Sequence, residues 1–222
     1  MSKQCGMGIN KDDAMAESIK KLFAENRFSR IIECGTFNGL GSTSRFCEQI
    51  KDNPIPFFSI EVNTFYYAMA HQNLRKAGLK NLVTLINGLS VPRNLLPKKE
   101  EIDLSIAYSD FMNAEDPKQP YLDEVDFNVL DDVLGELYQT DYEQENELLF
   151  LDSAGHMGWI EFQYAISLAR KNKTIILDDT NHIKHFKSMQ HIRQHPKIFT
   201  IIEENPDRHG FAIIKYHPEQ TK

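Results

Sequence analysis

A glycine-rich turn between a strand-forming run and a helix start is the feature of this sequence that most constrains its fold. Ile31 and Ile32 lead into Glu33, and three glycines follow at positions 35, 39 and 41. Ser42 then opens a segment of helical periodicity. Glycine removes the Cβ atoms that keep a ligand away from the backbone, and a first helical turn offers N–H donors to an anion. The pattern indicates either a ligand-binding turn or a plain tight turn.

The spacing of these glycines excludes two motifs. No Gly-Lys-Ser/Thr ends the turn, so it is not a nucleotide-phosphate loop. The order G-x-x-x-G-x-G also differs from the G-x-G-x-x-G of dinucleotide-binding domains. The interpretation therefore depends on the segments that follow.

Strand-like and helix-like segments alternate along most of the chain. Apolar runs typical of buried strands lie at 31–34, 57–61, 82–86, 148–152, 174–177, 198–202 and 211–216. Helical periodicity occurs at 11–26, 42–50, 64–77, 129–138, 158–170 and 185–194. Such alternation predicts an α/β fold with helices on both faces of a mainly parallel sheet, and the turn at 205–210 predicts a closing antiparallel hairpin.

The stretch from Leu89 to Asn146 departs from this alternation. It is too long for a bare connection, and it carries prolines and aromatic-acidic segments. We interpret residues 1–222 as a single domain in which an insertion at about 89–146 shapes a site. A surface elaboration is the alternative.

The composition of the chain limits the partners and the cellular location that we expect for this protein. The net charge of −7 argues against a nucleic-acid partner. No apolar run approaches the ~20 residues of a membrane span, so we expect no membrane partner. The three cysteines form neither a disulfide framework nor a metal motif, which predicts a cytoplasmic protein. The insertion and the N-terminal helix are candidate surfaces for a homodimer.

Carboxylates follow the predicted strands at corresponding positions. The carboxyl ends of parallel strands meet at one edge of a sheet, where open α/β folds bind their ligands. Helix capping is the alternative role for any one of these side chains. The set is Glu33, Glu61, Asp152, Asp178 and Asp179.

The pattern E-x-G-x-x-x-G-x-S, together with Glu61 and the closing hairpin, resembles the class I S-adenosylmethionine-dependent methyltransferases. The resemblance implies a Rossmann-like, doubly wound, seven-stranded sheet with an antiparallel last strand in a three-layer α/β/α arrangement. It also implies S-adenosylmethionine as the cofactor. Glu61 would accept hydrogen bonds from the ribose hydroxyls, and Asp152 would lie near the transferred methyl group. The predicted cofactor-binding residues are Glu33, Gly35, Phe37, Gly39, Ser42, Glu61, Gly88, Ser90 and Asp152.

The segments Leu151–His156 and Leu177–Asp179 are similar to the small-molecule O-methyltransferases that include the macrocin and catechol enzymes. That branch often carries Asp-Gly-Asp-His after the fourth strand. This chain has Asp-Ser-Ala-Gly-His, which is one residue longer and lacks the second Asp. The resemblance implies methyl transfer to a small-molecule acceptor, at a hydroxyl oxygen.

Two routes to a deprotonated acceptor remain open. In one, Asp152, Asp179 and Asn181 hold a hard divalent cation such as Mg²⁺, which acidifies the hydroxyl. In the other, His156 or His182 is the general base. Lys184 and Lys187 either lie near an anionic group or solubilise a helix. The rival functions are a catalytically inert S-adenosylmethionine-binding protein and a nicotinamide-dependent oxidoreductase.

Overall fold

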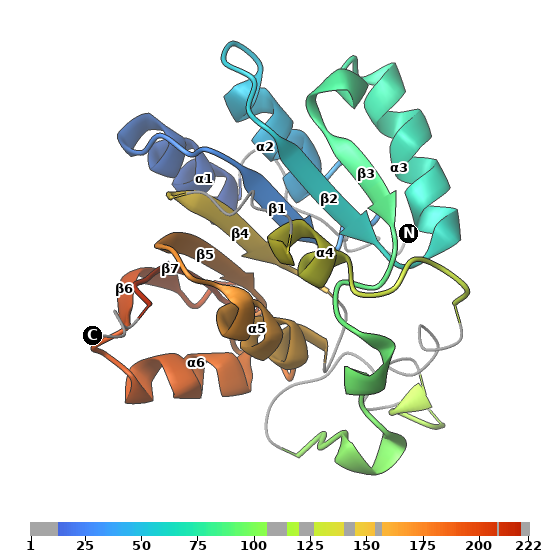
Figure 1. Ribbon diagram of the computed structural model, residues 1–222, viewed down its shortest axis with the longest axis vertical. Coiled ribbons are helices and arrows are strands. Elements are labelled where there is room, and N and C mark those ends of the chain that lie inside the picture. Colours follow the sequence, from blue (N-terminus) through green and yellow to red (C-terminus); the bar gives the residue numbers. More distant parts are fainter. Residues whose placement is uncertain are drawn as a thin grey trace, which may run out of the picture.

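Seven strands form one sheet in the order β3-β2-β1-β4-β5-β7-β6 (Figure 1). The computed structural model describes residues 13–105, 115–119, 127–139, 145–153, 157–207 and 209–218. The strands are β1 (Ile31–Cys34), β2 (Phe57–Glu61), β3 (Thr84–Asn87), β4 (Glu147–Leu151), β5 (Lys173–Asp178), β6 (Phe199–Asn205) and β7 (Phe211–Tyr216). Strand β7 is antiparallel to both of its neighbours, whereas the other strand pairs are parallel. The predicted doubly wound sheet and its closing antiparallel hairpin are confirmed.

Helices cover both faces of the sheet (Figure 1). One face carries α1 (Ala14–Glu25), α2 (Ser42–Ile50) and α3 (Thr64–Lys76), and the other carries α4 (Val133–Gln139), α5 (Met157–Leu168) and α6 (Phe186–Gln194). Three 3₁₀ turns occur in the connections, at η1 (Lys80–Leu82), η2 (Arg93–Leu95) and η3 (Lys99–Glu101). The three-layer α/β/α arrangement is therefore confirmed. Among the helices in the described ranges, none combines the length and the apolar character needed to cross a bilayer.

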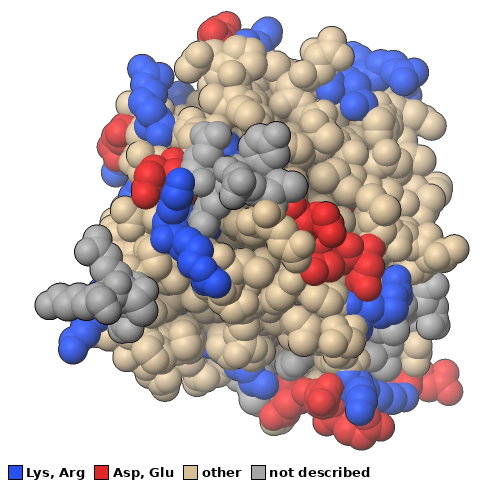
Figure 2. Space-filling view, viewed as in Figure 1, with Lys and Arg blue, Asp and Glu red and all other residues tan. Residues whose placement is uncertain are grey.

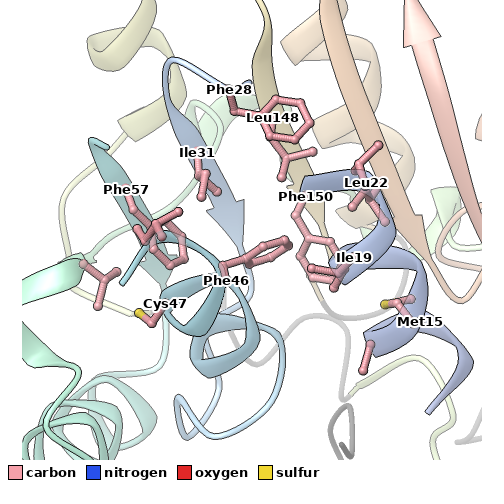
Figure 3. Close-up of a cluster of buried hydrophobic side chains, with 14 of the residues drawn as sticks. Met15, Ile19, Leu22, Phe28, Ile31, Phe46, Cys47, Phe57, Leu148 and Phe150 are labelled. Carbon is pink, nitrogen blue, oxygen red and sulfur yellow. The ribbon is translucent and has the colours of Figure 1, made fainter. Parts of the chain in front are cut away.

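Alternate residues of each strand supply two separate cores, because successive side chains of a strand point to opposite faces. Ile31 belongs to the core under α1, α2 and α3, whereas Ile32 belongs to the core under α4, α5 and α6. Phe46 of α2 lies at the centre of the first core (Figure 3). Its ring centroid is 5.8 Å from that of Phe57 and 5.4 Å from that of Phe150. These contacts fix α2, and with it the preceding glycine turn, against the strands.

Among the element boundaries that differ from the sequence prediction, two have a clear local cause. Strand β3 begins at Thr84 instead of Leu82, because Leu82 closes the turn η1. Helix α4 begins at Val133 instead of Val129, because Leu130 forms a parallel bridge with Gly88. Capping reinforces this later start, since Asp132 accepts a hydrogen bond from the main-chain N–H of Gly135 at 3.0 Å.

The described parts of the stretch from 89 to 146 are anchored to the sheet at the carboxyl end of β3. The main-chain N–H of Leu89 donates to the oxygen of Leu130 at 2.8 Å, and that of Val133 donates to Leu89 at 2.9 Å. Further along, the fully buried Ile102 packs against Ile183, which follows β5. The part from 89 to 105 therefore lies beside the carboxyl ends of the strands (Figure 1), where the prediction that the insertion shapes the acceptor site would place it.

A buried ion cluster lies at the opposite, amino-terminal edge of the sheet. Glu147 at the start of β4 contacts Arg30 at 2.6 Å and Lys173 at 2.7 Å through its two carboxylate oxygens. The ammonium of Lys173 also lies 4.6 Å from the ring centroid of Tyr138 in α4. Because the three charged side chains are almost completely buried, the cluster ties β1, β4 and β5 together at the end remote from the candidate site.

Candidate active site

Glu61 is held in a fixed position at the end of β2. Its Oε2 accepts a hydrogen bond from the main-chain N–H of Phe37 at 2.6 Å, and its Oε1 accepts one from Asn63 at 2.8 Å. The residue is only 7% exposed. Burial raises the pKa of Glu61 to about 7 against the opposing effect of these two N–H donors. Each oxygen still has a lone pair, so the carboxylate can accept two more hydrogen bonds from a ligand.

The glycine turn wraps over this carboxylate in left-handed backbone conformations. Gly35 has φ of +96°, Phe37 of +50° and Gly39 of +78°. The side-chain amide of Asn73 in α3 donates to the main-chain oxygen of Asn38 at 2.9 Å and holds the turn in place. The turn thus presents the main-chain N–H of Phe37 to Glu61, which joins two of the predicted cofactor-binding residues in one hydrogen bond.

Gly35 lies directly against the end of β4. A Cβ atom at this position would be 2.5 Å from the main-chain oxygen of Asp152 and 3.1 Å from the nitrogen of Ser153. The glycine therefore brings the ends of β1 and β4 closer together than any other residue type would allow. Gly39 packs in the same way on Ala70, to which a Cβ would come within 3.1 Å.

Glu33 is completely buried beneath the start of α2. Its carboxylate accepts hydrogen bonds from the hydroxyls of Ser42 at 2.5 Å, Thr43 at 2.7 Å and Ser59 at 2.5 Å. Burial raises the pKa of Glu33 to about 7, although these three donors act to lower it. The arrangement gives Glu33 and Ser42 a structural role that links β1, β2 and α2, and their predicted contact with a cofactor stays a prediction.

Gly88 and Ser90 lie after β3, next to α4 and α5. A Cβ at Gly88 would be 2.6 Å from Val133, so the close packing of α4 requires a glycine here. The hydroxyl of Ser90 donates to Oε1 of Glu161 in α5, and Ser153 donates to the same oxygen at 2.6 Å. Burial raises the pKa of Glu161 to about 7, and its Oε2 has no hydrogen-bond partner among the described residues.

Asp152, Asp178 and Asp179 bring carboxylate oxygens to within 4.8 Å of one another at the ends of β4 and β5. The ammonium of Lys184 lies between two of them, 2.6 Å from Oδ1 of Asp152 and 2.6 Å from Oδ2 of Asp179. Burial acts to raise the pKa of Asp179, but the charge and hydrogen bond of Lys184 outweigh burial and lower it. Both carboxylates are therefore paired with a cation that belongs to the chain itself.

Two of the three predicted metal ligands, Asp152 and Asp179, come together with Asp178, and a ligand role for Asn181 stays a prediction. Asn181 is exposed, and its side-chain amide nitrogen lies 2.7 Å from the Cβ position of Gly210. A divalent ion bound by Asp152 and Asp179 would meet the positive charge of Lys184 at the same oxygens. The residues in this arrangement do not fit a metal ion.

Of the two candidate bases, His156 lies outside the described residues. His182 is buried, and its Nδ1 accepts a hydrogen bond from the main-chain N–H of Lys184 at 3.2 Å. Nδ1 therefore carries no proton, so the neutral ring has its N–H at Nε2, and its basic lone pair is already engaged by the main chain. The neighbouring His185 is structural: its Nε2 lies 3.1 Å from the oxygen of Leu151, and burial lowers its pKa to about 3.

Sequence reasoning missed Glu161 and left the role of Lys184 open. Glu161 shares the buried face of α5 with Met157, Phe162 and Ala165, so a carboxylate on an otherwise apolar helix face was the available signal. Lys184 precedes α6 and follows the aspartates of β5 closely, but its second partner, Asp152, comes from another strand. Nothing in the local pattern indicates that pairing.

Comparisons with known proteins establish the fold. No protein-family model matches the sequence, and no curated protein matches it significantly. Among solved structures, a proposed caffeoyl-CoA O-methyltransferase from Staphylococcus aureus is 17% identical, with 93% of this chain and 84% of that chain covered and a TM-score of 0.60. The O-methyltransferase TomG from Streptomyces achromogenes, solved in complex with SAM, is 14% identical, with coverages of 95% and 82% and a TM-score of 0.55.

A proposed rRNA methylase from Clostridium thermocellum is also similar, at 10% identity, with coverages of 94% and 99% and a TM-score of 0.52. The neighbours thus include methyltransferases of more than one kind. At these identities the likeness establishes a shared Rossmann-like fold, and the chemistry has to be argued from the site.

Proposed function

We propose that this protein is an S-adenosylmethionine-dependent methyltransferase that transfers a methyl group to an oxygen of a small molecule. The observation that carries the proposal is the carboxylate of Glu61, fixed at the end of β2 by the main-chain N–H groups of Phe37 and Asn63. An acidic residue at this position in a doubly wound sheet is suited to bind both hydroxyls of a ribose. The fold shared with known methyltransferases supports the same assignment.

The residues present fit the cofactor. Two ribose hydroxyls need two acceptors, and each oxygen of Glu61 has one lone pair left after its main-chain hydrogen bond. The left-handed turn at Gly35, Phe37 and Gly39 lies beside this carboxylate and has no Cβ at its two glycines. The unpartnered buried oxygen of Glu161, next to Ser90, would be satisfied by a donor such as the adenine amino group.

Bound S-adenosylmethionine would supply a methyl group on a positively charged sulfur. Displacement at that carbon requires an oxygen held in line, so the protein mainly orients the acceptor and excludes water. Asp152 is well placed for this role, because the ammonium of Lys184 fixes its Oδ1 and Gly35 holds its backbone against β1. To take the acceptor proton, His182 would first have to release the main-chain N–H of Lys184 from Nδ1, and His156 is the other candidate base.

The charge of the protein favours a small-molecule acceptor over a nucleic acid, whose phosphates an acidic protein would repel. The net charge is −7, and Lys and Arg are scattered in small separate groups over the face in view (Figure 2). Ile102 packs on Ile183, in the loop that also carries His182 and Lys184, and this contact supports the proposal that the insertion shapes the acceptor site. Cys34 and Cys47 are free thiols, which supports the proposed cytoplasmic location.

Calorimetric titration with S-adenosylmethionine and its demethylated product tests the cofactor assignment. We expect both to bind the wild type, and Glu61→Gln to weaken binding by about 10- to 100-fold through loss of charged acceptors. Glu48→Gln, on the solvent side of α2, is the matched control and should bind like the wild type. Absence of binding to the wild type, or equal binding by Glu61→Gln, would overturn the proposal. NADH binding in its place would favour an oxidoreductase.

A transfer assay separates the enzyme from an inert binding protein. Labelled methyl donor is incubated with a panel of phenols, aliphatic alcohols, carboxylic acids and amines. Transfer to an oxygen acceptor supports the proposal, whereas transfer only to amines overturns the assignment to oxygen. Cofactor binding with no transfer to any acceptor class identifies a binding protein.

A further inference from the structure

Lys184 is buried at the centre of an acidic cluster. The residue is 6% exposed, and its ammonium contacts Asp152 from the end of β4 and Asp179 from just beyond β5, each at 2.6 Å. Asp178, with its oxygens inside the same 4.8 Å cluster, adds a third carboxylate. The cluster has the oxygen-only chemistry that hard cations prefer, but the chain supplies the cation itself.

The surrounding structure is built to hold this side chain. A Cβ at Gly158 in α5 would lie 2.6 Å from Cγ of Lys184, so the glycine makes room for the aliphatic part of the lysine. The main-chain N–H of Lys184 donates to Nδ1 of His182, and the preceding Ile183 packs on Ile102. The ammonium is therefore fixed from both the backbone and the side-chain stem.

The lysine is charged in this setting. Burial alone would lower the pKa of Lys184, but Asp152, Asp179 and Asp178 together raise it above its usual value. An ammonium has three N–H donors, and two are used by Asp152 and Asp179. The third N–H is not used by these two hydrogen bonds.

We propose that the ammonium of Lys184 takes the place of a divalent metal ion between Asp152 and Asp179, so that the site orients an acceptor oxygen without a metal. The role of the third N–H as donor to that oxygen rests on the proposed methyltransferase function. The exclusion of a metal ion does not rest on the proposed function, because it follows from the charges of Lys184 and the two aspartates and from the distances between them.

Mn²⁺ binding, followed by the loss of the free-ion signal in electron paramagnetic resonance, tests this inference. Wild type should bind Mn²⁺ only weakly at the site. Lys184→Met removes the charge and leaves the carboxylates, so it should bind one Mn²⁺ about tenfold or more tightly than the wild type. Lys187→Met, in α6, is the matched control and should behave like the wild type. Adding Asp179→Asn to Lys184→Met should abolish the gain.

Stoichiometric Mn²⁺ binding by the wild type, as tight as that of Lys184→Met, would overturn the inference. A folded Lys184→Met variant that binds no better than Lys187→Met would overturn it too. Circular dichroism establishes whether Lys184→Met folds, and if it does not, the wild-type titration decides alone. The titration needs no S-adenosylmethionine, so failure of the proposed function, seen as absent cofactor binding, is a separate result.

Discussion

The Cβ position of Gly35 lies 2.5 Å from the main-chain oxygen of Asp152, so the end of β1 can meet the end of β4 only where a glycine follows β1. The same residue has φ of +96°, a conformation that residues with a Cβ rarely adopt. One glycine thus joins the turn beside Glu61 to the carboxylate cluster around Lys184.

Gly35→Ala is expected to destabilise the protein and to weaken cofactor binding. The strained φ costs about 1 kcal/mol, and the clash with the backbone of Asp152 adds about 1–3 kcal/mol. Gly78→Ala is the control, because Gly78 has φ of +72° with nothing within 4 Å of its Cβ position. Urea unfolding of both variants separates the two effects. Equal losses of stability would show that the approach to Asp152 is unimportant.

Cofactor affinity is expected to depend on pH through Glu61. Burial raises the pKa of this carboxyl to about 7, and only the ionised form accepts hydrogen bonds from both ribose hydroxyls. The affinity for S-adenosylmethionine should therefore fall by about tenfold between pH 8 and pH 6. Calorimetry at several pH values measures this change. Glu61→Gln should bind weakly without this pH dependence, and an unchanged slope in that variant would assign the titration to another group.

The buried cluster of Glu147, Arg30 and Lys173 gives a prediction about stability alone. Glu147→Gln leaves two buried cations without their counter-charge and should cost about 3–5 kcal/mol of unfolding free energy. Glu204→Gln breaks the exposed pair with Arg193 and should change stability by about 0.5 kcal/mol or less. Urea unfolding measures both. Similar losses in the two variants would contradict the energetic role of burial.

The parts of this fold that could be predicted from the sequence are those that depend on residues close together in the chain. Buried strands appear as short apolar runs and helices as apolar positions at helical spacing, and the glycine turn with Glu61 follows from residues close to it in the chain. These signals predicted the alternation of strands and helices and the closing hairpin, whereas the seven-stranded, doubly wound sheet was implied by the resemblance to class I methyltransferases.

The polar contacts within the site could not be predicted in this way. The ammonium of Lys184 lies between carboxylates from two strands, and its stem needs the absent side chain of Gly158 on a third element. Glu161 acquires its partners, Ser90 and Ser153, only when three segments meet. Pairings of this kind depend on tertiary distances of a few ångströms, and the spacing of residues along one segment does not encode them.

Glu161 is expected to make the stability of the protein depend on pH. Burial raises the pKa of Glu161 from 4.5 to about 7, so between these values the folded state binds more protons than the unfolded state. Stability should therefore fall as pH rises from about 5 to about 7, by about 3 kcal/mol from this carboxyl. Urea unfolding across that range should show a shallower fall for Glu161→Gln, whereas Glu25→Gln, on the exposed part of α1, should keep the wild-type slope. A stability that rises over this range, or a slope that Glu161→Gln leaves intact, would mean that the buried carboxyl is ionised in the folded protein. Its Oε2 would then need a donor that the described residues do not supply.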